Sequence, residues 1–308
     1  MKGMSFRWLA VFVLFSSLSY ASIVGDVRES ITKNDFTQAK AALDAYQTQH
    51  GITPEYLEAM SWMARGALAS KQLDTAETYA RQTERLSRQQ LYKRKLDAEP
   101  HLPVALGAAL EVQARVLAAR GLQSQAVLLL KHAIASYGAT SIRPRLQKNL
   151  NMLGMVGQPA PTLNINQYLG VKPMSLVQLK GSPVFLFFWA HWCPDCKGEA
   201  PILTQLCSEY TSRGLKVIAP TQLYGYAAGG EDAKPQDELS YIGQVWGRYY
   251  SGLQDVPVPV SKVNFDVYGA STTPTLVLID RTGHVAMYHP GAMSYNDLRA
   301  EIEKVMAN

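Results

Sequence analysis

The stretch Phe185-Leu-Phe-Phe-Trp-Ala-His-Trp-Cys193-Pro-Asp-Cys196-Lys-Gly-Glu199-Ala-Pro201 decides the fold of the second half of this chain. It begins within Val184 to Trp189, a short apolar and aromatic run of the kind that forms a strand covered on both faces. Pro194 suits the first position of a helix, where its missing N–H group costs no hydrogen bond. We therefore expect a buried strand, a turn, and a helix that starts just after Cys193.

Cys193 and Cys196 form a C-x-x-C pair at the start of this predicted helix. The unpaired N–H groups and the dipole of a helix N-terminus favour an anion, and here that anion is the Cys193 thiolate. Cys196 lies one helical turn further on, so it can close a disulfide with Cys193. A strand that leads directly into such a pair predicts redox chemistry.

A zinc site is the alternative interpretation of the C-x-x-C pair. Structural zinc needs four ligands, and catalytic zinc needs three ligands and a water molecule. The chain has three cysteines, and Cys207 lies on the wrong part of the helix to join the other two. His191 is the nearest other donor, and no second paired motif follows, so we expect no metal. Cys207 falls on the buried stripe of the helix and is expected to be an inert core thiol.

The first 21 residues have the composition of a secretory signal peptide. Lys2 and Arg7 precede an apolar run from Trp8 to Leu18, and Ser19-Tyr20-Ala21 matches a small-x-small cleavage site. The apolar run is short for a membrane span, although an uncleaved anchor is the alternative. The expected location is the periplasm, where thiol–disulfide exchange is in use.

Charge is distributed unevenly between the two halves of the chain. Residues 22–156 contain 17 basic and 12 acidic residues, whereas residues 157–308 contain 11 basic and 13 acidic ones. The asymmetry is modest and no base-stacking motif accompanies it, so nucleic acid is not expected as a partner.

Residues 22–156 show helical periodicity and resemble a tetratricopeptide (TPR) array. Three segments each combine a polar turn, one large apolar residue and an alanine that opens a helix, at Ala39, Ala76 and Ala126. The spacings approximate the 34-residue helix–turn–helix repeat with insertions. We expect an all-α, TPR-like domain whose groove is a protein–protein interaction surface. An ordinary helical bundle is the alternative.

Helical periodicity stops at the Gly- and Pro-rich segment 151–161, which places a domain boundary at residue 156. Residues 157–308 then read as strand, helix, strand, helix, hairpin and helix, which is the order of the thioredoxin fold. We expect an α/β domain with a central mixed sheet flanked by helices. The expected strands are 162–165, 175–179, 184–189, 215–220, 276–280 and 285–288, and the expected helices are 194–212, 236–250 and 294–306.

Several separated motifs of this second half resemble the TlpA/ResA-type thiol–disulfide oxidoreductases. In order, they are Val156-Gly-Gln-Pro-Ala-Pro161, Leu179-Lys-Gly181, Phe188-Trp-Ala-His-Trp-Cys-Pro-Asp-Cys196 with Glu199 and Pro201, Thr273-Pro-Thr275 and Leu278-Ile-Asp-Arg-Thr-Gly283. The resemblance covers residues 157–308. It implies an enzyme that needs no cofactor beyond its own redox-active disulfide. It also implies disulfide-containing client proteins and an upstream, membrane-bound electron donor.

The resemblance extends to the residues around the cysteine pair. Glu199 matches the glutamate beside the disulfide in this family, and it is expected to carry a proton for the thiols. A solvated carboxylate without that role is the alternative. Thioredoxin itself has a buried acid six residues before the first cysteine, but that position is Phe187 here.

Substrate contacts and redox tuning involve a further set of residues. The Thr273-Pro274 bond matches the family's cis peptide, which would present the backbone of Thr273 to a substrate strand. Trp192 is expected to shape the same docking surface. Pro194 and Asp195, between the cysteines, are expected to tune the redox potential.

Asp195 and Glu199 place negative charge near the Cys193 thiolate, which raises its pKa and favours the disulfide form. The hypothesis is therefore a protein-disulfide reductase, and a protonated His191 would offset part of this effect. An isomerase or oxidant with the same site and a non-catalytic binding adaptor are the alternatives. A peroxidase is a further alternative, but the chain lacks a peroxidatic cysteine in a Thr-rich loop.

The Gly-rich loop 224–237 is expected to be either a substrate-facing lid or a variable insertion.

Overall fold

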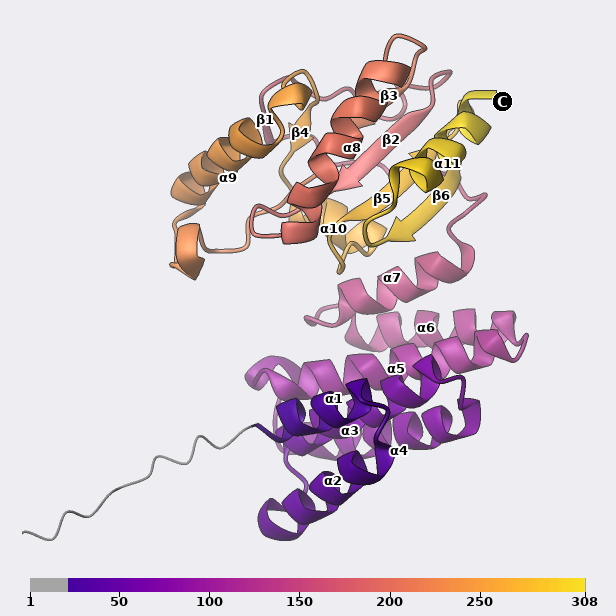
Figure 1. Cartoon of the computed structure of the whole chain (residues 1–308), viewed down its shortest axis with the longest axis vertical. Helices are drawn as coiled ribbons and strands as arrows, with labels where there is room; N and C mark the ends of the chain where they lie inside the picture. The colour runs from indigo at the N-terminus through magenta and orange to yellow at the C-terminus, as the bar shows by residue number, and fades with distance from the viewer. Residues whose placement is uncertain (1–21, 308) are drawn as a thin grey trace, which may run out of the picture.

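The structure is a computed structural model that describes residues 22–307, and it consists of a helical half and an α/β half (Figure 1). The predicted signal peptide, residues 1–21, lies outside the described residues. In Figure 1 the helical half occupies the lower part of the view and the α/β half the upper part.

The helical half contains seven α-helices among the described residues. They are α1 (Ile23–Thr32), α2 (Phe36–His50), α3 (Pro54–Ala69), α4 (Leu73–Leu91), α5 (His101–Ala119), α6 (Gln123–Tyr137) and α7 (Arg143–Gly154), with a 3-10 turn at Leu96–Ala98. Each odd-numbered helix packs against the next odd-numbered helix and against its sequence neighbours. Ala39, Ala76 and Ala126 are fully buried in α2, α4 and α6. The all-α prediction is confirmed, whereas the TPR-like assignment stays a prediction.

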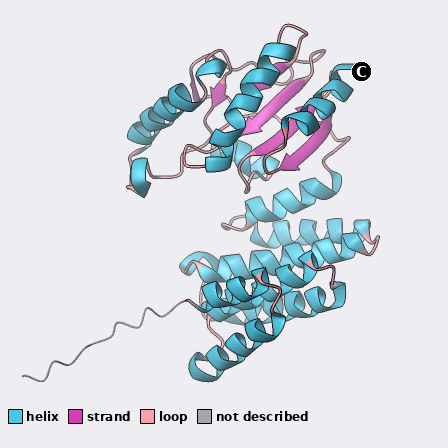
Figure 2. Cartoon of the chain, viewed as in Figure 1, coloured by secondary structure: helices cyan, strands magenta, loops and turns pink. Residues whose placement is uncertain are grey.

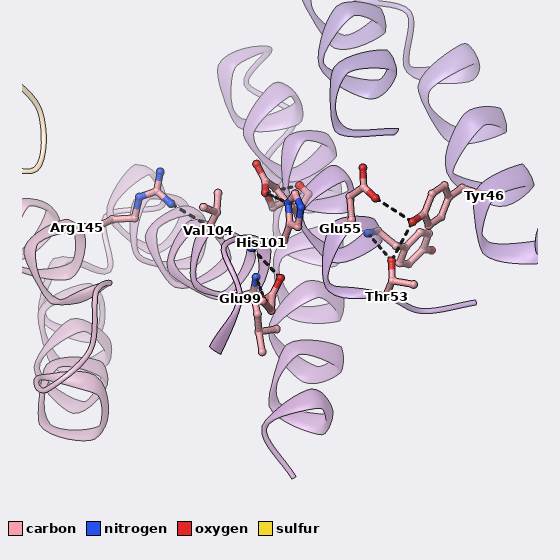
Figure 3. Close-up of polar contacts among 11 residues, drawn as sticks. Tyr46, Thr53, Glu55, Glu99, His101, Val104 and Arg145 are labelled. Atoms are coloured by element: carbon pink, nitrogen blue, oxygen red, sulfur yellow. Dashed lines mark hydrogen bonds and ion pairs between the residues drawn. The ribbon is translucent and has the colours of Figure 1, made fainter. Parts of the chain in front are cut away.

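Side-chain caps fix where several of these helices begin. The hydroxyl of Thr53 accepts a hydrogen bond from the Tyr56 N–H group at the start of α3, and Pro54 occupies the first helical position. Glu99 accepts from the N–H groups of His101 and Leu102 at the start of α5, at 3.0 and 2.5 Å. Figure 3 shows these caps where the ends of α3 and α5 approach each other.

Helix α5 is long and apolar enough to cross a membrane, and it is the one such helix among residues 22–307. In its apolar window, 67% of the residues are buried inside the molecule, against α3, α4 and α6. Its composition therefore fits the central helix of a packed helical layer.

The α/β half is built on a four-stranded mixed sheet with the strand order β3-β2-β5-β6 (Figure 2). Strand β2 runs parallel to β3 and antiparallel to β5, and β5 and β6 form an antiparallel hairpin. These strands are β2 (Val184–Phe188), β3 (Lys216–Ile218), β5 (Thr275–Ile279) and β6 (Val285–Pro290), and a separate pair joins β1 (Tyr168–Leu169) to β4 (Val258–Pro259). The helices are α8 (Pro194–Tyr210), α9 (Pro235–Tyr249), α10 (Lys262–Tyr268) and α11 (Tyr295–Ala307).

Strand β2 is buried on both faces, as its apolar sequence predicted. Phe185 and Phe187 point into a core formed with α8, α9 and α11, whereas Leu186 and Phe188 point into a second core with α10. Alternate residues of a strand face opposite sides, so a run of apolar residues serves both cores. The strand thereby holds the turn that follows it between two packed layers.

Two of the predicted strands are wrong. Residues 175–179 form a turn instead, in which the Ser175 N–H donates to Gln178 Oε1 at 2.9 Å. Residues 162–165 have no strand partner, because the buried side chain of Asn264 bonds both the N–H and the carbonyl of Asn164. In both places a side chain supplies the hydrogen bonds that a neighbouring strand would otherwise make. The short helix α10, which carries Asn264, was not predicted.

The two halves meet where α7 packs against α10 and β6. The side-chain amide of Asn151 donates to the Tyr268 carbonyl at 2.8 Å. Gly269 has φ +61°, and a Cβ at this position would collide with the backbone of Lys148 in α7. Met155, directly after α7, packs into the second core of the sheet. The close approach therefore requires a glycine at residue 269.

Candidate active site

Cys193 and Cys196 form a disulfide at the N-terminus of α8, where β2 and its turn deliver them. Cys193 is the N-cap residue of the helix, and its Sγ accepts a hydrogen bond from the Cys196 N–H at 3.1 Å. In many helices a side-chain oxygen of the N-cap residue accepts this hydrogen bond. Here the sulfur of Cys193 accepts it, and so satisfies one of the N–H groups that have no partner within the helix. The same N–H would stabilise a Cys193 thiolate after reduction.

The cis peptide Thr273–Pro274 lies against this disulfide. The bond is cis, as the resemblance implied, and the Thr273 carbonyl oxygen is 3.4 Å from Cys193 Sγ. Trp192 is 45% exposed and meets the ring of Tyr224 edge-on at 5.5 Å between centroids. The structure thus brings Trp192 and Thr273 together around Cys193, although they lie some 80 residues apart in the chain.

Glu199 lies one turn beyond Cys196 on α8 and is buried, with 1% of its surface exposed. It accepts one hydrogen bond, from the Met293 N–H at 3.2 Å. Burial, with a smaller contribution from the charge of Asp195, raises the pKa of Glu199 to about 7. The alternative of a solvated carboxylate is therefore wrong, since this side chain is buried.

The residues between the cysteines, Pro194 and Asp195, are exposed at the start of α8. His191, expected as a charge that offsets Asp195, is instead buried inside the turn. Burial is the largest influence on the pKa of His191 and lowers it, so the ring is neutral at neutral pH. The prediction that a protonated His191 offsets the negative charge of Asp195 is therefore wrong.

His191 has a buried carboxylate partner that sequence reasoning missed. Its Nε2 lies 3.2 Å from Oε1 of Glu238, and each of the two side chains is 1% exposed. The rings of Tyr224, Tyr226 and Tyr241 surround the imidazole edge-on at 5.4–5.6 Å between centroids. His191 and Glu238 are 47 residues apart and carry no shared motif, so only the fold reveals the pair.

Glu238 also holds the start of the Gly-rich loop. Its two carboxylate oxygens accept the N–H groups of Tyr224 and Gly225, at 2.5 and 2.8 Å. Further along, the N–H of Ala227 donates to the Glu231 carbonyl, which closes a local turn. The base of the loop is thus fixed to α9 and to the active-site turn, whereas residues 228–232 are exposed.

Cys207 is a buried thiol on α8, and burial raises its pKa to about 12. This agrees with the prediction of an inert core cysteine. Phe187, at the position of the acid in thioredoxin, is buried against Tyr250. Within residues 22–307, no three His, Cys, Asp or Glu side chains are grouped so that they could hold a metal ion.

Comparisons with known proteins find relatives of the C-terminal half. The model of the AhpC/TSA family matches residues 156–221. The thiol-disulfide oxidoreductase ResA of Bacillus thuringiensis (strain Al Hakam) is 28% identical over 150 residues, which is 49% of this chain and 78% of that protein. The thiol:disulfide interchange protein DsbE of Xylella fastidiosa (strain Temecula1 / ATCC 700964) is 28% identical over 155 residues, which is 50% of this chain and 71% of that protein.

Among solved structures, a DsbE-type thiol:disulfide interchange protein from Chlorobium tepidum is 27% identical, with a TM-score of 0.38. The match covers 49% of this chain and 97% of that one. The strand order, the family model and the sequence relatives agree that the C-terminal half has a thioredoxin-like fold, and its homologues are named thiol-disulfide oxidoreductases or interchange proteins. The prediction of such an enzyme is confirmed at this level. Thiol–disulfide exchange, the chemistry in these names, takes place between cysteine sulfurs and needs no added cofactor.

Proposed function

We propose that the chain is an exported protein-disulfide reductase that acts through Cys193 and Cys196. The observation that carries this proposal is the disulfide at the start of α8, with Cys193 Sγ against the carbonyl of the cis peptide Thr273–Pro274. The sulfur sits where helix N–H groups stabilise a thiolate, and the backbone of Thr273 lies beside it, where a substrate strand would pair with it.

The reaction is a two-step exchange of thiols and disulfides. The Cys193 thiolate attacks one sulfur of a client disulfide, which forms a mixed disulfide and releases the other client sulfur as a thiolate. The Cys196 thiolate then attacks Cys193 Sγ. This breaks the mixed disulfide, releases the second client thiolate and leaves the Cys193–Cys196 disulfide. Two electrons pass to the client, so a separate thiol donor must reduce the pair again.

Glu199 serves the second step as the proton acceptor for Cys196. The two residues are one helical turn apart, and a carboxyl with a pKa of about 7 exchanges protons readily at neutral pH. The buried carboxylate is expected to reach the thiol of Cys196 directly or through one water molecule. Trp192, Thr273 and Pro274 bind the client around the attacking sulfur.

The negative charges near the site favour reduction of clients over their oxidation. Asp195 lies between the cysteines and Glu199 follows them, while the neutral His191 provides no compensating charge. Carboxylates close to the Cys193 thiolate destabilise the reduced form, which lowers the reduction potential of the pair. Pro194 and Asp195 are thus the residues that tune the potential.

Location and partners complete the proposal. The sequence of residues 1–21 supports export to the periplasm, or retention there by an uncleaved anchor. A membrane-bound thiol donor then supplies the electrons, and the helical half recruits a client or partner protein. This assigns catalysis to residues 157–308 and recruitment to residues 22–156.

Insulin reduction tests the catalytic part of the proposal. The wild-type chain with a thiol donor should precipitate the insulin B chain, and Cys193→Ser should abolish this activity. Cys207→Ser is the matched control and should retain it, because Cys207 is not part of the exchange. Equal activity of Cys193→Ser and the wild type would refute the catalytic proposal and favour the adaptor.

The direction of the reaction is tested by the reduction potential of the Cys193–Cys196 pair, measured against glutathione. We expect a value below about −200 mV, on the reducing side of the known range. A value near −120 mV, that of a strong oxidant, would overturn the reductase and favour the isomerase or oxidant. Cys196→Ala should in addition hold clients as mixed disulfides on Cys193.

A further inference from the structure

One face of the helical half collects more positive than negative charge. We call it the basic face and define it by residues from α1, α3, α5 and α7, namely Arg28, Glu58, Trp62, Arg65, Glu111, Arg115, Arg145 and Lys148. Arg65 lies at its centre, because it interacts electrostatically with charged groups from all four of these helices. Figure 3 shows Arg145 reaching from α7 to the backbone of Val104 on α5, where its Nη1 donates at 3.2 Å.

The two carboxylates of the basic face are already occupied. Glu111 pairs with Arg145 at 3.2 Å, with Lys148 at 3.6 Å and with Arg115 at 3.9 Å. Glu58 pairs with His101 at 2.8 Å. Five cations thus face two carboxylates, one of which is shared three ways, and this leaves a net positive charge on the face.

Arg65 is the cation that this shortage affects most. Its guanidinium stacks on the ring of Trp62 at 4.5 Å from the centroid, and within residues 22–307 it forms no hydrogen bond or ion pair. Burial and the nearby charge of Arg145 lower the pKa of Arg65 to about 10. Glu111 and Glu58 offset part of this effect from a distance, but neither forms an ion pair with Arg65. A partly buried cation without a direct ion-pair partner costs free energy, and natural structures normally pair such groups.

Two hydrogen-bond donors in this stack are also unpaired. Nη2 of Arg65 and Nε1 of Trp62 are buried and have no acceptor among the described residues. The two residues are three positions apart on α3, so their side chains are neighbours on one face of the helix. The guanidinium of Arg28 lies over the same Trp62 ring at 5.0 Å, and its side chain is exposed. A negatively charged acceptor that reached this stack would supply the partner that these two donors lack.

We propose that the basic face binds an acidic segment of a client or partner polypeptide, with a carboxylate of that segment accepting hydrogen bonds from Arg65 and Trp62. The proposal rests on the recruiting role given above to the helical half, and it supplies the chemistry of the partner. Carboxylate is the planar acceptor that a guanidinium binds with two parallel hydrogen bonds.

The extent of the basic face points to a polypeptide and not to a small anion. Its cations come from four helices packed side by side, and neighbouring packed helices are about 8–10 Å apart, so the face spans roughly 25 Å. An extended chain covers this distance with about eight residues. One small carboxylate would occupy Arg65 alone, and the cations of α1, α5 and α7 would still share the single carboxylate of Glu111 or have no carboxylate partner.

The basic face is connected to the catalytic site through α7. This helix carries Arg145 and Lys148, and the backbone of Lys148 lies against Gly269. Gly269 precedes Pro274 by five residues, which is at most about 18 Å of chain. The α7 end of the basic face is therefore joined to the catalytic site by one backbone contact and a short stretch of chain.

Fluorescence polarisation of a labelled peptide tests the proposal. The protein is the full chain with Cys193→Ser and Cys196→Ser, so that no mixed disulfide contributes to binding. The probe is a ten-residue peptide with six Glu or Asp residues, and its control has Gln and Asn in their place. We expect saturable binding of the acidic peptide, no binding of the control, and a loss of affinity when salt rises from about 20 to 200 mM.

Variants locate the binding site. Arg65→Gln should weaken binding about tenfold or more, as expected for the loss of a charge-assisted hydrogen bond, and Trp62→Phe by a smaller factor. Arg28→Gln is exposed and safe for folding, and should weaken binding about threefold. The matched control is Arg85→Gln, which removes the same charge from the exposed side of α4 and should change affinity less than twofold.

Three outcomes would overturn the proposal. They are no binding of the acidic peptide at low salt, an equal loss of affinity in Arg28→Gln and Arg85→Gln, and equal binding of free glutamate or of a single-stranded oligonucleotide. The redox proposal is judged separately, by insulin reduction of Arg65→Gln with its cysteines intact. If the wild type reduces insulin but does not bind the acidic peptide, the basic face is not a docking site, and the proposal of a reductase is unaffected.

Discussion

Two buried carboxylates flank the catalytic turn, and their surroundings differ. Glu238 accepts three hydrogen bonds, from the imidazole of His191 and from two backbone N–H groups at the base of the 224–237 loop. Glu199 accepts one, from Met293, and its pKa is raised to about 7. We call Glu238 the well-supplied carboxylate, because three donors stabilise its charged form, and such a group holds the surrounding structure together. We call Glu199 the poorly supplied carboxylate, because one donor leaves its charged form less stable, and such a group can take up and release a proton near neutral pH.

The largest expected effect is that of removing the well-supplied carboxylate. Glu238→Ala leaves three donors unpaired in a buried place and should lower the free energy of unfolding by about 3 kcal/mol. Urea unfolding followed by tryptophan fluorescence measures this loss. Glu231→Ala, on the exposed tip of the same loop, is the control and should change stability little. If Glu238→Ala and Glu231→Ala were equally stable, the hydrogen bonds of Glu238 would not hold this part of the structure together.

Removing the charge of the poorly supplied carboxylate, Glu199, should stabilise the protein, whereas removing Glu238 should destabilise it. The folded-state pKa of Glu199 is about 7 and its ordinary value is 4.5, so the folded protein binds the extra proton between these pH values. Stability therefore falls as pH rises from 4.5 to 7, and Glu199→Gln should raise the free energy of unfolding at pH 8 by about 2 kcal/mol.

At pH 4 the same variant should be nearly neutral, since Glu199 is then protonated in both states. Urea unfolding of the oxidised protein at both pH values measures the change. Glu238→Gln is the matched variant and should destabilise at pH 8. If both glutamine variants shift stability in the same direction, the comparison fails.

The catalytic rate gives the third test. Glu199→Gln should slow insulin reduction near pH 7 by about tenfold, because Cys196 loses its nearby proton acceptor. Trapping of clients by Cys193 should persist, since the first step does not use Glu199. Stopped-flow tryptophan fluorescence separates the two steps. A variant that slows both steps equally would assign Glu199 to packing and not to proton transfer.

A smaller effect is expected where the imidazole alone is removed. His191→Phe takes one of the three donors from Glu238, and it also removes Nδ1, which is buried and has no partner among residues 22–307. The net loss of stability should be about 1 kcal/mol or less. Thermal unfolding measures it. A loss as large as that of Glu238→Ala would mean that the imidazole, and not the backbone donors, anchors the carboxylate.

The smallest effect is expected from Asp195→Asn. The charge of exposed Asp195 contributes to the raised pKa of Glu199, after burial. Its removal should lower the pH midpoint of Glu199 by less than about half a unit. An NMR titration of labelled glutamate carbons in the oxidised protein measures this midpoint. A midpoint that moved as far as the ordinary value of 4.5 would make charge, and not burial, the main cause.

The parts of the molecule that could be predicted are those with a periodic or local signal. Strand β2, helix α8 and the β5–β6 hairpin follow from runs of apolar residues between turn residues. The cysteine pair follows from its spacing. The Glu238–His191 pair could not be predicted, because its partners come from different elements and neither belongs to a motif. Helix α10 is short, and the Asn264 contacts that replace a strand at residues 162–165 depend on the tertiary fold.

The seam between the two halves also limits how independently they can evolve. Met155 fills part of the second core of the sheet, Asn151 bonds the end of α10, and the glycine at residue 269 admits the backbone of α7. A catalytic half that began at residue 157 would lose this cover and leave Tyr268 and its neighbours open to water. The helical half is thus not an interchangeable module. A gene fusion that supplied a different recruiting domain would also have to supply a replacement for α7.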